Sequence, residues 1–315
     1  MTTTKSATLY QNLRTNVGQV LFGKEKTVRL LLCALLAQGH VLLEDVPGTG
    51  KTSLVRALSA SISGEDKRVQ FTPDLLPSDV TGINFYRQGT GEFVLRRGPI
   101  FTNLFLADEI NRATPRTQAA LLECMEERQA TIDGETIPLP DVFMVLATMN
   151  PIEFQGTFPL PEAQIDRFMM KLHPGYPDEA DERRIIERIC APEQGVALSP
   201  VASIDDVLAA REEIARVQIS DAIRDYIVRI VRSTRESDKI KLGVSPRGTV
   251  ALTRACRALA AMQGRDFVIP DDVNELAVPV LAHRIISQSQ SSIRLSGSNE
   301  AIIEYLLSKT PAPLQ

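Results

Sequence analysis

A short apolar run followed at once by a glycine-rich loop and a helix is the feature that most constrains how this chain can fold. The apolar run covers residues 40–44, the loop continues with DVPGTG, and residues 51–60 have a helical pattern. Four further apolar runs are strand candidates, at residues 68–71, 104–107, 142–148 and 168–172. Continuous apolar strands with helices between them are typical of a parallel sheet that is buried on both faces. We therefore predict an α/β fold for the first half of the chain.

The second half of the chain has a different pattern. Residues 173–177 (HPGYP) are dense in turn formers and are followed by a charged segment. Beyond it, apolar residues recur at helical spacing, as in residues 223–231 and 252–262. We place a domain boundary at the turn. The prediction is an α/β domain over residues 1–175 and an all-helical domain over residues 176–315.

Two segments of the first domain alternate between apolar and polar residues on either side of a turn. Residues 84–95 do so around a glycine-rich turn, and residues 130–137 carry Asp133 and Gly134 between β-branched residues. The Asp-Gly pair is a strong signal for a two-residue hairpin turn. We predict that both segments are β-hairpins inserted into the α/β domain.

The composition is that of an ordinary globular protein of 315 residues. Lys and Arg number 35 and Asp and Glu 39, so the formal net charge is −4, which argues against a protein held by a strong basic field to nucleic acid or anionic lipid. The four cysteines and three histidines are scattered, and zinc sites need clustered ligands. The start of the sequence has no apolar signal core. Because no apolar run is long enough to span a membrane, we expect a cytoplasmic protein without a membrane span.

The glycine-rich loop has the residues and the setting of a phosphate-binding loop. It follows a strand and opens a helix, so backbone N–H groups and the positive end of the helix dipole both point at the ligand. We expect Lys51 to reach the β- and γ-phosphates of ATP and the Thr52 hydroxyl to occupy one Mg²⁺ position. The predicted nucleotide-binding residues of this loop are Pro47, Gly48, Thr49, Gly50, Lys51, Thr52 and Ser53. Asp45 stands where the usual pattern has Gly, but the PGTGKT core is intact and argues against a chance glycine turn.

Two carboxylates and an amide follow the apolar runs further along the chain. Asp108 and Glu109 end the run at 104–107, which we expect to lie beside the strand of the phosphate loop. Asp108 could then hold Mg²⁺ through water, and Glu109 could orient and polarise an attacking water. Asn150 ends the next run, where its amide could hold that water or the γ-phosphate from the opposite side. The alternatives are an acidic pair that caps the next helix and an Asn that is an ordinary turn residue before proline.

Several longer motifs share one family pattern. They are GHVLLEDVPG at 39–48, FTPDLLPSDVTG at 71–82, GPIF at 98–101, ADEINRA at 107–113, AALLECMEE at 119–127, DGE at 133–135 and GTFPLPEAQIDRF at 156–168. Together they resemble the MoxR family of AAA+ ATPases over about residues 20–310. The last motif is the most specific, because a generic phosphate-binding loop protein would not carry it.

This resemblance implies roles for three further residues. AAA+ proteins form rings, usually hexamers, with ATP at each subunit junction and the helical domain as a lid. Arg167 resembles the arginine finger that reaches a neighbour's γ-phosphate; a surface ion pair with Glu162 or Asp166 is the alternative. Arg247 resembles the sensor 2 arginine of the lid, or is a solvent-facing helix residue. The segment that ends at Gly23 resembles the strip that packs on adenine, or is apolar core.

The resemblance also implies a function and leaves two rivals to it. It implies Mg²⁺-dependent ATP hydrolysis and a chaperone-like role in which a protein client is remodelled or matured together with a von Willebrand factor A-domain partner. A nucleic-acid motor of the helicase-like clade is the first rival, but the hairpin at 130–137 carries Asp133 and Glu135 and no Lys or Arg, the wrong charge for a phosphate backbone. A nucleotide-gated scaffold with little turnover is the second, and the presence of Glu109 and Arg167 argues against it.

Overall fold

A central parallel sheet organises the first half of the protein. The structure is a computed structural model that describes residues 4–44, 50–89, 91–150, 156–190, 198–288 and 298–313. The strands of the sheet are β1 (Val41–Glu44), β2 (Asp66–Gln70), β5 (Leu104–Asp108), β8 (Met144–Met149) and β9 (Met170–Leu172). Their order across the sheet is β2-β5-β8-β1-β9, and every pairing is parallel. The predicted α/β fold with a parallel sheet is confirmed.

The sheet is buried on both faces, as its apolar strands predict. Successive residues of the three central strands belong to two different buried clusters. The first cluster includes the strand residues Leu43, Leu106 and Leu146. The second includes Leu42, Phe105 and Val145. Since successive side chains of a strand point to opposite faces, each face of the sheet packs against its own layer of helices.

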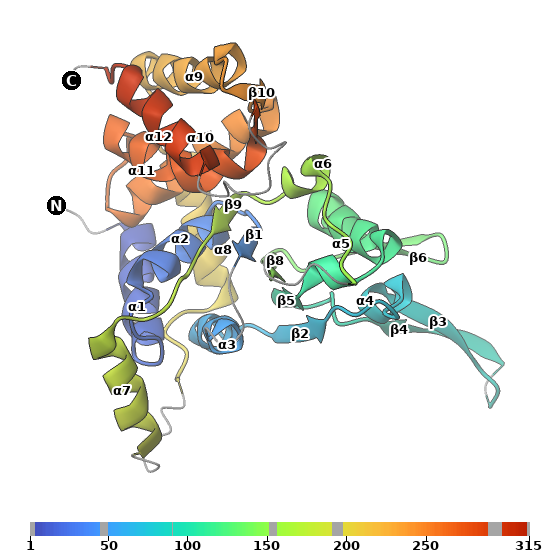
Figure 1. Ribbon diagram of the computed structural model, residues 1–315. Coiled ribbons are helices and arrows are strands. Elements are labelled where there is room, and N and C mark those ends of the chain that lie inside the picture. Colours follow the sequence, from blue (N-terminus) through green and yellow to red (C-terminus); the bar gives the residue numbers. More distant parts are fainter. Residues whose placement is uncertain are drawn as a thin grey trace.

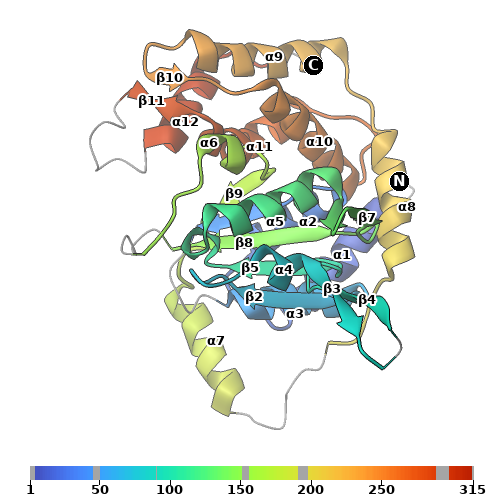
Figure 2. The same ribbon diagram turned by 90° about the vertical axis from the view of Figure 1, so that its right-hand side faces the viewer.

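Helices of the α/β half cover the two faces. They are α1 (Lys5–Gly18), α2 (Glu25–Leu36), α3 (Lys51–Ser61), α4 (Pro77–Thr81), the 3₁₀ turn η1 (Ile110–Arg112), α5 (Pro115–Glu127) and α6 (Glu162–Ile165). Buried residues of α1, α2 and α3 join the first cluster, and those of α4 and α5 join the second. Figure 2 shows α3 below the sheet and α5 above it.

Both predicted hairpins are present. The first pairs β3 (Gly82–Arg87) with β4 (Glu92–Arg97), and the second pairs β6 (Gln129–Ile132) with β7 (Glu135–Pro138). At the tip of the second, Asp133 and Gly134 have φ angles of 49° and 88°, the left-handed conformation that a type I′ turn requires. The β3–β4 hairpin extends away from the body of the protein (Figure 1).

The second half of the chain is helical. It contains α7 (Glu179–Cys190), α8 (Ile204–Ala215), α9 (Asp221–Glu236), α10 (Pro246–Met262), α11 (Pro270–Leu281), η3 (Ala282–Arg284) and α12 (Ser298–Lys309). A short antiparallel pair, β10 (Ile240–Leu242) with β11 (Ile286–Ser287), adds to these helices. Helices α9 to α12 gather into one group, whereas α7 lies at the other end of the molecule in both views (Figures 1 and 2). Among the described residues, no helix is long and apolar enough to cross a membrane.

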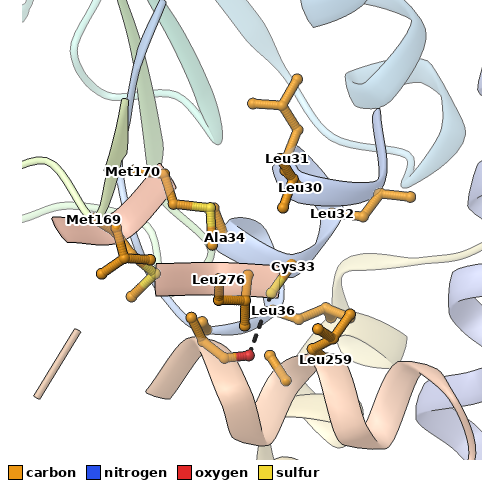
Figure 3. Packing of buried hydrophobic residues seen from close by; sticks show 14 of the residues in the cluster. Leu30, Leu31, Leu32, Cys33, Ala34, Leu36, Met169, Met170, Leu259 and Leu276 are labelled. Atoms are coloured by element: carbon orange, nitrogen blue, oxygen red, sulfur yellow. Dashed lines mark hydrogen bonds between the residues drawn. The ribbon is translucent and has the colours of Figure 1, made fainter. Parts of the chain in front are cut away.

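The first cluster also joins the two halves of the chain. It contains leucines of α2, Met170 of β9, Leu259 of α10 and Leu276 of α11, and Figure 3 shows Leu36 of α2 close to Leu259 and Leu276. The Sγ atom of Cys33 on α2 lies 3.4 Å from the carbonyl oxygen of Ala255 on α10, to which it donates a hydrogen bond. Cys33 is fully buried, and its burial raises the pKa of the thiol. The scattered cysteine therefore acts here as a small core residue.

His40 is a buried polar link at the start of β1. Its Nδ1 atom accepts a hydrogen bond from the backbone N–H of Val145 at 2.9 Å, and its Nε2 atom is 3.1 Å from the carbonyl oxygen of Met125 on α5. The ring must therefore carry its proton on Nε2 and remain neutral. Burial, with a smaller contribution from Arg128, lowers the pKa of His40 to about 4.

We predict that His40 makes the fold less stable in mild acid. Above pH ~6.5 the imidazole is neutral in both the folded and the unfolded chain; below it only the unfolded chain takes the proton, so stability falls as the pH approaches 4. The expected loss of unfolding free energy between pH 7 and pH 5 is about 2 kcal/mol. Denaturant titrations of the unmodified protein and of His40→Gln, whose amide keeps an acceptor but does not titrate, measure it.

Only the difference between the two pH profiles tests this prediction. His283 is also buried and has a lowered pKa, but it is present in both proteins and its contribution cancels. Parallel profiles between pH 7 and pH 5 would contradict the assignment of His40 as a neutral buried link.

Candidate functional site

The predicted site residues converge on the edge of the sheet where the parallel strands end. Lys51, Thr52 and Ser53 form the first turn of α3, and Gly50, with a left-handed φ of 83°, precedes them. Asp108 ends β5, Glu109 follows it, and Asn150 follows β8. The predicted residues Pro47, Gly48 and Thr49, together with Asp45, lie outside the residues that the structure describes. The carboxyl ends of parallel strands are where ligands bind in open α/β sheets.

One expectation about this edge is wrong. The strand that ends at Asp108 was expected beside β1, but β8 lies between β1 and β5. Both β5 and β8 are apolar strands buried on both faces, so their composition does not fix which of them pairs with β1. Strand β8 therefore separates β1, which precedes the phosphate loop, from β5, which ends in the acidic pair. Asn150 follows this middle strand.

A hydroxyl in the sheet fixes the acidic pair. The Oγ1 atom of Thr148 donates a hydrogen bond to Oδ1 of Asp108 at 2.7 Å and accepts one from the backbone N–H of Glu109 at 2.8 Å. Thr148 is fully buried and Asp108 is 9% exposed. One buried side chain therefore sets the position of both acidic residues.

Two arginines bind the carboxylates themselves. Arg68, on the edge strand β2, donates from Nη2 to Oδ2 of Asp108 at 2.8 Å. Arg112 donates from Nη1 to Oε2 of Glu109 at 2.9 Å. Glu109 itself has left-handed backbone angles, with φ 55° and ψ 51°, which cost a non-glycine residue free energy and occur often at active sites. Glu109 is also the N-cap residue of η1, as the alternative interpretation expects, but its side chain makes no capping hydrogen bond there.

Sequence reasoning missed Thr148, Arg68 and Arg112. The only signal for Thr148 was a hydroxyl inside an otherwise apolar run, because buried polar groups need partners. Arg68 and Arg112 gave no signal, since their roles depend on pairing that sequence does not show.

The oxygen atoms at this edge fit a magnesium ion. Among the described residues, His, Cys, Asp and Glu form no group of three or more that could hold a metal ion. Mg²⁺ needs no such group, because it binds through one or two carboxylates, substrate phosphates and water. Oδ2 of Asp108 accepts two hydrogen bonds from Arg68, whereas Oδ1 accepts one from Thr148 and can accept a further bond. Thr52 adds a hydroxyl at the start of α3.

The segment before α2 lies next to the phosphate loop. Leu21 is buried in the first cluster and its Cδ2 atom is 3.9 Å from where a Cβ would lie on Gly50. Gly23 has a left-handed φ of 67°, and the carboxylate of Asp181 on α7 occupies the space beside it. Leu21 thus belongs to the apolar core and also borders the predicted nucleotide site.

The side chain of Asn150, at the end of β8, is largely buried, with 7% of the residue exposed.

Arg167 and Arg247 share one carboxylate. The Nη2 atom of Arg167 is 3.2 Å from Oε2 of Glu126, and Nη2 of Arg247 pairs with Oε1 of the same side chain. The partner is thus on α5, rather than the Glu162 or Asp166 expected for a surface pair of Arg167. Ile165 of α6 and the buried residues of α5 pack with the second cluster, whereas α3 packs with the first. The arginines thus pair with Glu126 on the face of the sheet opposite to α3, the helix that begins with Lys51.

A buried ion pair holds this arrangement. Asp166 accepts hydrogen bonds from Nε of Arg284 at 2.9 Å and from Oγ of Ser245 at 3.0 Å. The Arg284 side chain is 1% exposed, and burial lowers its pKa to about 10 although Asp166 opposes the shift. Asp166 precedes Arg167, and Ser245 lies two residues before Arg247. The lid and the segment after α6 thus set both arginines together.

Comparisons with known proteins agree with this geometry. The model of the ATPase family associated with various cellular activities (AAA) matches residues 40–170, and an AAA lid domain model matches residues 232–305. Chaperone MoxR1 of Mycobacterium tuberculosis is 44% identical over 86% of this chain and 74% of its own, and protein MoxR of Paracoccus denitrificans is 31% identical over 96% of each. The chain belongs to the MoxR family of AAA+ ATPases.

Two further relatives cover nearly the whole MoxR-family chain. The uncharacterized protein YeaC of Bacillus subtilis is 48% identical over 95% of this chain and 93% of its own. A crystal structure of a candidate ATPase from Cytophaga hutchinsonii matches with a TM-score of 0.90 and 40% identity, over 98% of this chain and 97% of that one. The predicted AAA+ α/β core with a helical lid is confirmed at the level of the family.

We predict that Thr148→Val disables the site and weakens the fold. Valine has nearly the same shape but leaves the Glu109 N–H and the Asp108 Oδ1 atom without their buried partner, which costs about 1–3 kcal/mol of unfolding free energy. Denaturant titration measures that loss, and phosphate release from ATP measures the effect on the site.

Two matched variants control for the change of side chain. Thr131→Val alters an exposed strand threonine and should change stability by less than about 0.5 kcal/mol. Thr148→Ser keeps the hydroxyl and should retain most of the turnover. If Thr148→Ser lost as much turnover as Thr148→Val, the bridging role of the hydroxyl would be wrong.

Proposed function

We propose that this protein is a Mg²⁺-dependent ATPase that converts ATP and water to ADP and phosphate. The observation that carries the proposal is the buried hydroxyl bridge of Thr148, which fixes Asp108 and Glu109 at the sheet edge where α3 begins with Lys51 and Thr52. A carboxylate fixed at this edge, a second one beside it and a lysine at a helix start are the parts that phosphoryl transfer to water requires.

Each residue has a distinct task in this proposal. Gly50 to Ser53, with Pro47, Gly48 and Thr49 before them, bind the phosphates, and Lys51 neutralises the β- and γ-phosphates. Asp108 and Thr52 hold Mg²⁺, which neutralises phosphate charge when it is bound. Glu109 orients and polarises the attacking water, and Asn150 contacts that water or the γ-phosphate.

Glu109 must release its hydrogen bond with Arg112 before its Oε2 atom can contact the attacking water. Its Oε2 atom accepts a hydrogen bond from Arg112, so that oxygen is already engaged by a cation of the protein rather than by a water. We infer that Arg112 holds Glu109 in a resting position and that nucleotide binding releases it. We also propose that Gly23, two residues after the Leu21 that approaches Gly50, belongs to the surface that contacts adenine.

The chain is proposed to act in a hexameric ring. Arg167 and Arg247 lie together on the face of the sheet away from α3, so they suit a neighbour's nucleotide better than the chain's own. In this arrangement Arg167 stabilises the developing charge on the γ-phosphate, and Arg247 senses the same phosphate through the lid. Glu126 pairs with both until a neighbour's phosphates compete for them, and its single negative charge leaves part of their positive charge unbalanced.

The biological role follows from the family. Two relatives are named as MoxR proteins, and one of these is named a chaperone. We propose a chaperone-like role in the cytoplasm, with residues 1–175 as the nucleotide-binding domain and residues 176–315 as its lid. A protein client and a von Willebrand factor A-domain partner complete the proposal, and no nucleic acid is required.

The reaction is tested by measuring phosphate release from ATP and Mg²⁺ over a range of protein concentrations. Turnover per chain should rise steeply with concentration, because each site is completed by a neighbour. Glu109→Gln should bind ATP but lose at least ~100-fold in turnover, the lower range for a catalytic base. Turnover in Glu109→Gln equal to that of the unmodified protein would contradict the role of Glu109.

Mixed rings test the action of Arg167 in trans. Arg167→Ala should bind ATP normally and lose turnover, and mixing it with Glu109→Gln should restore part of the activity, because some junctions then combine an intact Glu109 with an intact Arg167. Arg224→Ala, which removes an exposed arginine paired with Asp221 on α9, serves as the matched control. Absence of rescue, with ring formation verified by sedimentation, would contradict action across subunits.

A further inference from the structure

A second cluster of arginines lies at the edge of the sheet opposite the candidate nucleotide site. The end of α2, helix α8 and helix α10 enclose a cavity of about 190 Å³. Arg211 of α8 and Arg254 and Arg257 of α10 line it, together with Gln38. Gln38 lies just before β1, whereas the phosphate loop follows β1. The cavity is therefore distinct from the nucleotide site.

The base of this cavity is rigid. Arg211 is 7% exposed, and its two terminal nitrogens donate to the carbonyl oxygens of Asp141 at 2.9 Å and Leu35 at 2.8 Å. A fourth arginine, Arg128, donates to the carbonyl oxygens of Gln38 at 3.0 Å and Asp141 at 3.4 Å. These acceptors are neutral carbonyls, so they hold the guanidinium groups in place without neutralising them.

The positive charge of the cluster has no matching negative charge. Within the described part of the chain, none of these four arginines has a carboxylate oxygen within 4.0 Å, whereas other arginines of the protein pair with Asp or Glu. The Nε atoms of Arg211 and Arg257 are buried and have no acceptor among the residues that the structure describes. Arg254 and Arg257 are three residues apart on α10, where like charges repel each other.

Burial and, to a smaller extent, mutual repulsion disfavour the charged forms of two of these arginines. Burial, followed by Arg128, lowers the pKa of Arg211 to about 10. Burial and then Arg254 lower the pKa of Arg128. Asp141, an exposed residue, opposes both shifts from a distance. A protein rarely buries positive charge without a partner, because desolvation is costly.

We propose that this cavity binds a small, multiply charged anion of the phosphate class. Guanidinium groups match phosphate oxygens in pairs, and arginine is the residue that proteins use most for this geometry. The cavity is smaller than the ~300–1,000 Å³ of pockets for drug-sized ligands. Its volume therefore suits one or two phosphate groups rather than a ligand that is enclosed whole. This proposal does not depend on the ATPase activity.

Pyrophosphate is the probe that tests the site, with binding measured by isothermal titration calorimetry at low ionic strength. Because the phosphate loop also attracts phosphates, the measurement is made on the full chain carrying Lys51→Ala. We expect one binding event per chain in that protein. Adding Arg254→Gln and Arg257→Gln should weaken it at least ~10-fold, the effect of losing one charge-assisted hydrogen bond to the anion.

A second pair of substitutions separates the site from the overall charge of the protein. Arg224→Gln with Arg232→Gln removes the same charge from α9, where both side chains are exposed and ion-paired, and should leave pyrophosphate binding unchanged. Equal weakening by both pairs would overturn the proposal, because only the net charge would then matter.

Two further outcomes would also overturn it. One is the absence of any pyrophosphate binding in the Lys51→Ala protein. The other is a change of oligomeric state in Arg254→Gln, Arg257→Gln without a change in pyrophosphate binding, which would assign the cluster to acidic residues of a neighbouring chain. Circular dichroism verifies folding; the expected result is a fold at least as stable as before, since two mutually repelling charges are removed.

Discussion

The burial of the central sheet on both faces is the constraint on which the rest of the structure depends. The strands β5 and β8 alternate between two apolar clusters, so neither face offers a place for polar chemistry. Polar side chains can appear only where the strands end, and there they meet because all five strands run in the same direction. The position of Asp108, Glu109 and Asn150 at one edge is thus a consequence of hydrophobic burial.

Thr148 is the exception that this constraint allows. A hydroxyl inside a buried strand needs both a donor and an acceptor, and it finds them in the N–H of Glu109 and the carboxylate of Asp108. The hydrogen bond from the Glu109 N–H to Thr148 anchors the chain at the residue where the backbone turns into its left-handed conformation. The same contact fixes the neighbouring strand against β5, which links the packing of the sheet to the geometry of the site.

The local parts of this fold could be predicted from sequence, whereas the contacts between them could not. Apolar runs located the strands, and Asp133 and Gly134 located a turn, because these depend on neighbouring residues alone. The insertion of β8 between β1 and β5 was missed, since strand order depends on how separate layers pack. The shared use of Glu126 by Arg167 and Arg247 was missed for the same reason: those residues are brought together only by the lid.

Three groups of arginines in this protein differ in the groups that balance their positive charge. Arg284 is buried and paired with Asp166, so its charge is satisfied within the fold and its role is to join the lid to the α/β half. Arg167 and Arg247 are partly exposed and share a single carboxylate, so two positive charges have one negative partner. The cluster around Arg211 has carbonyl partners and no carboxylate close by. Unbalanced charge increases along this series, and so does the free energy that an anionic ligand could supply by binding. Charge balance therefore distinguishes an arginine that holds the fold together from arginines that are positioned for a ligand.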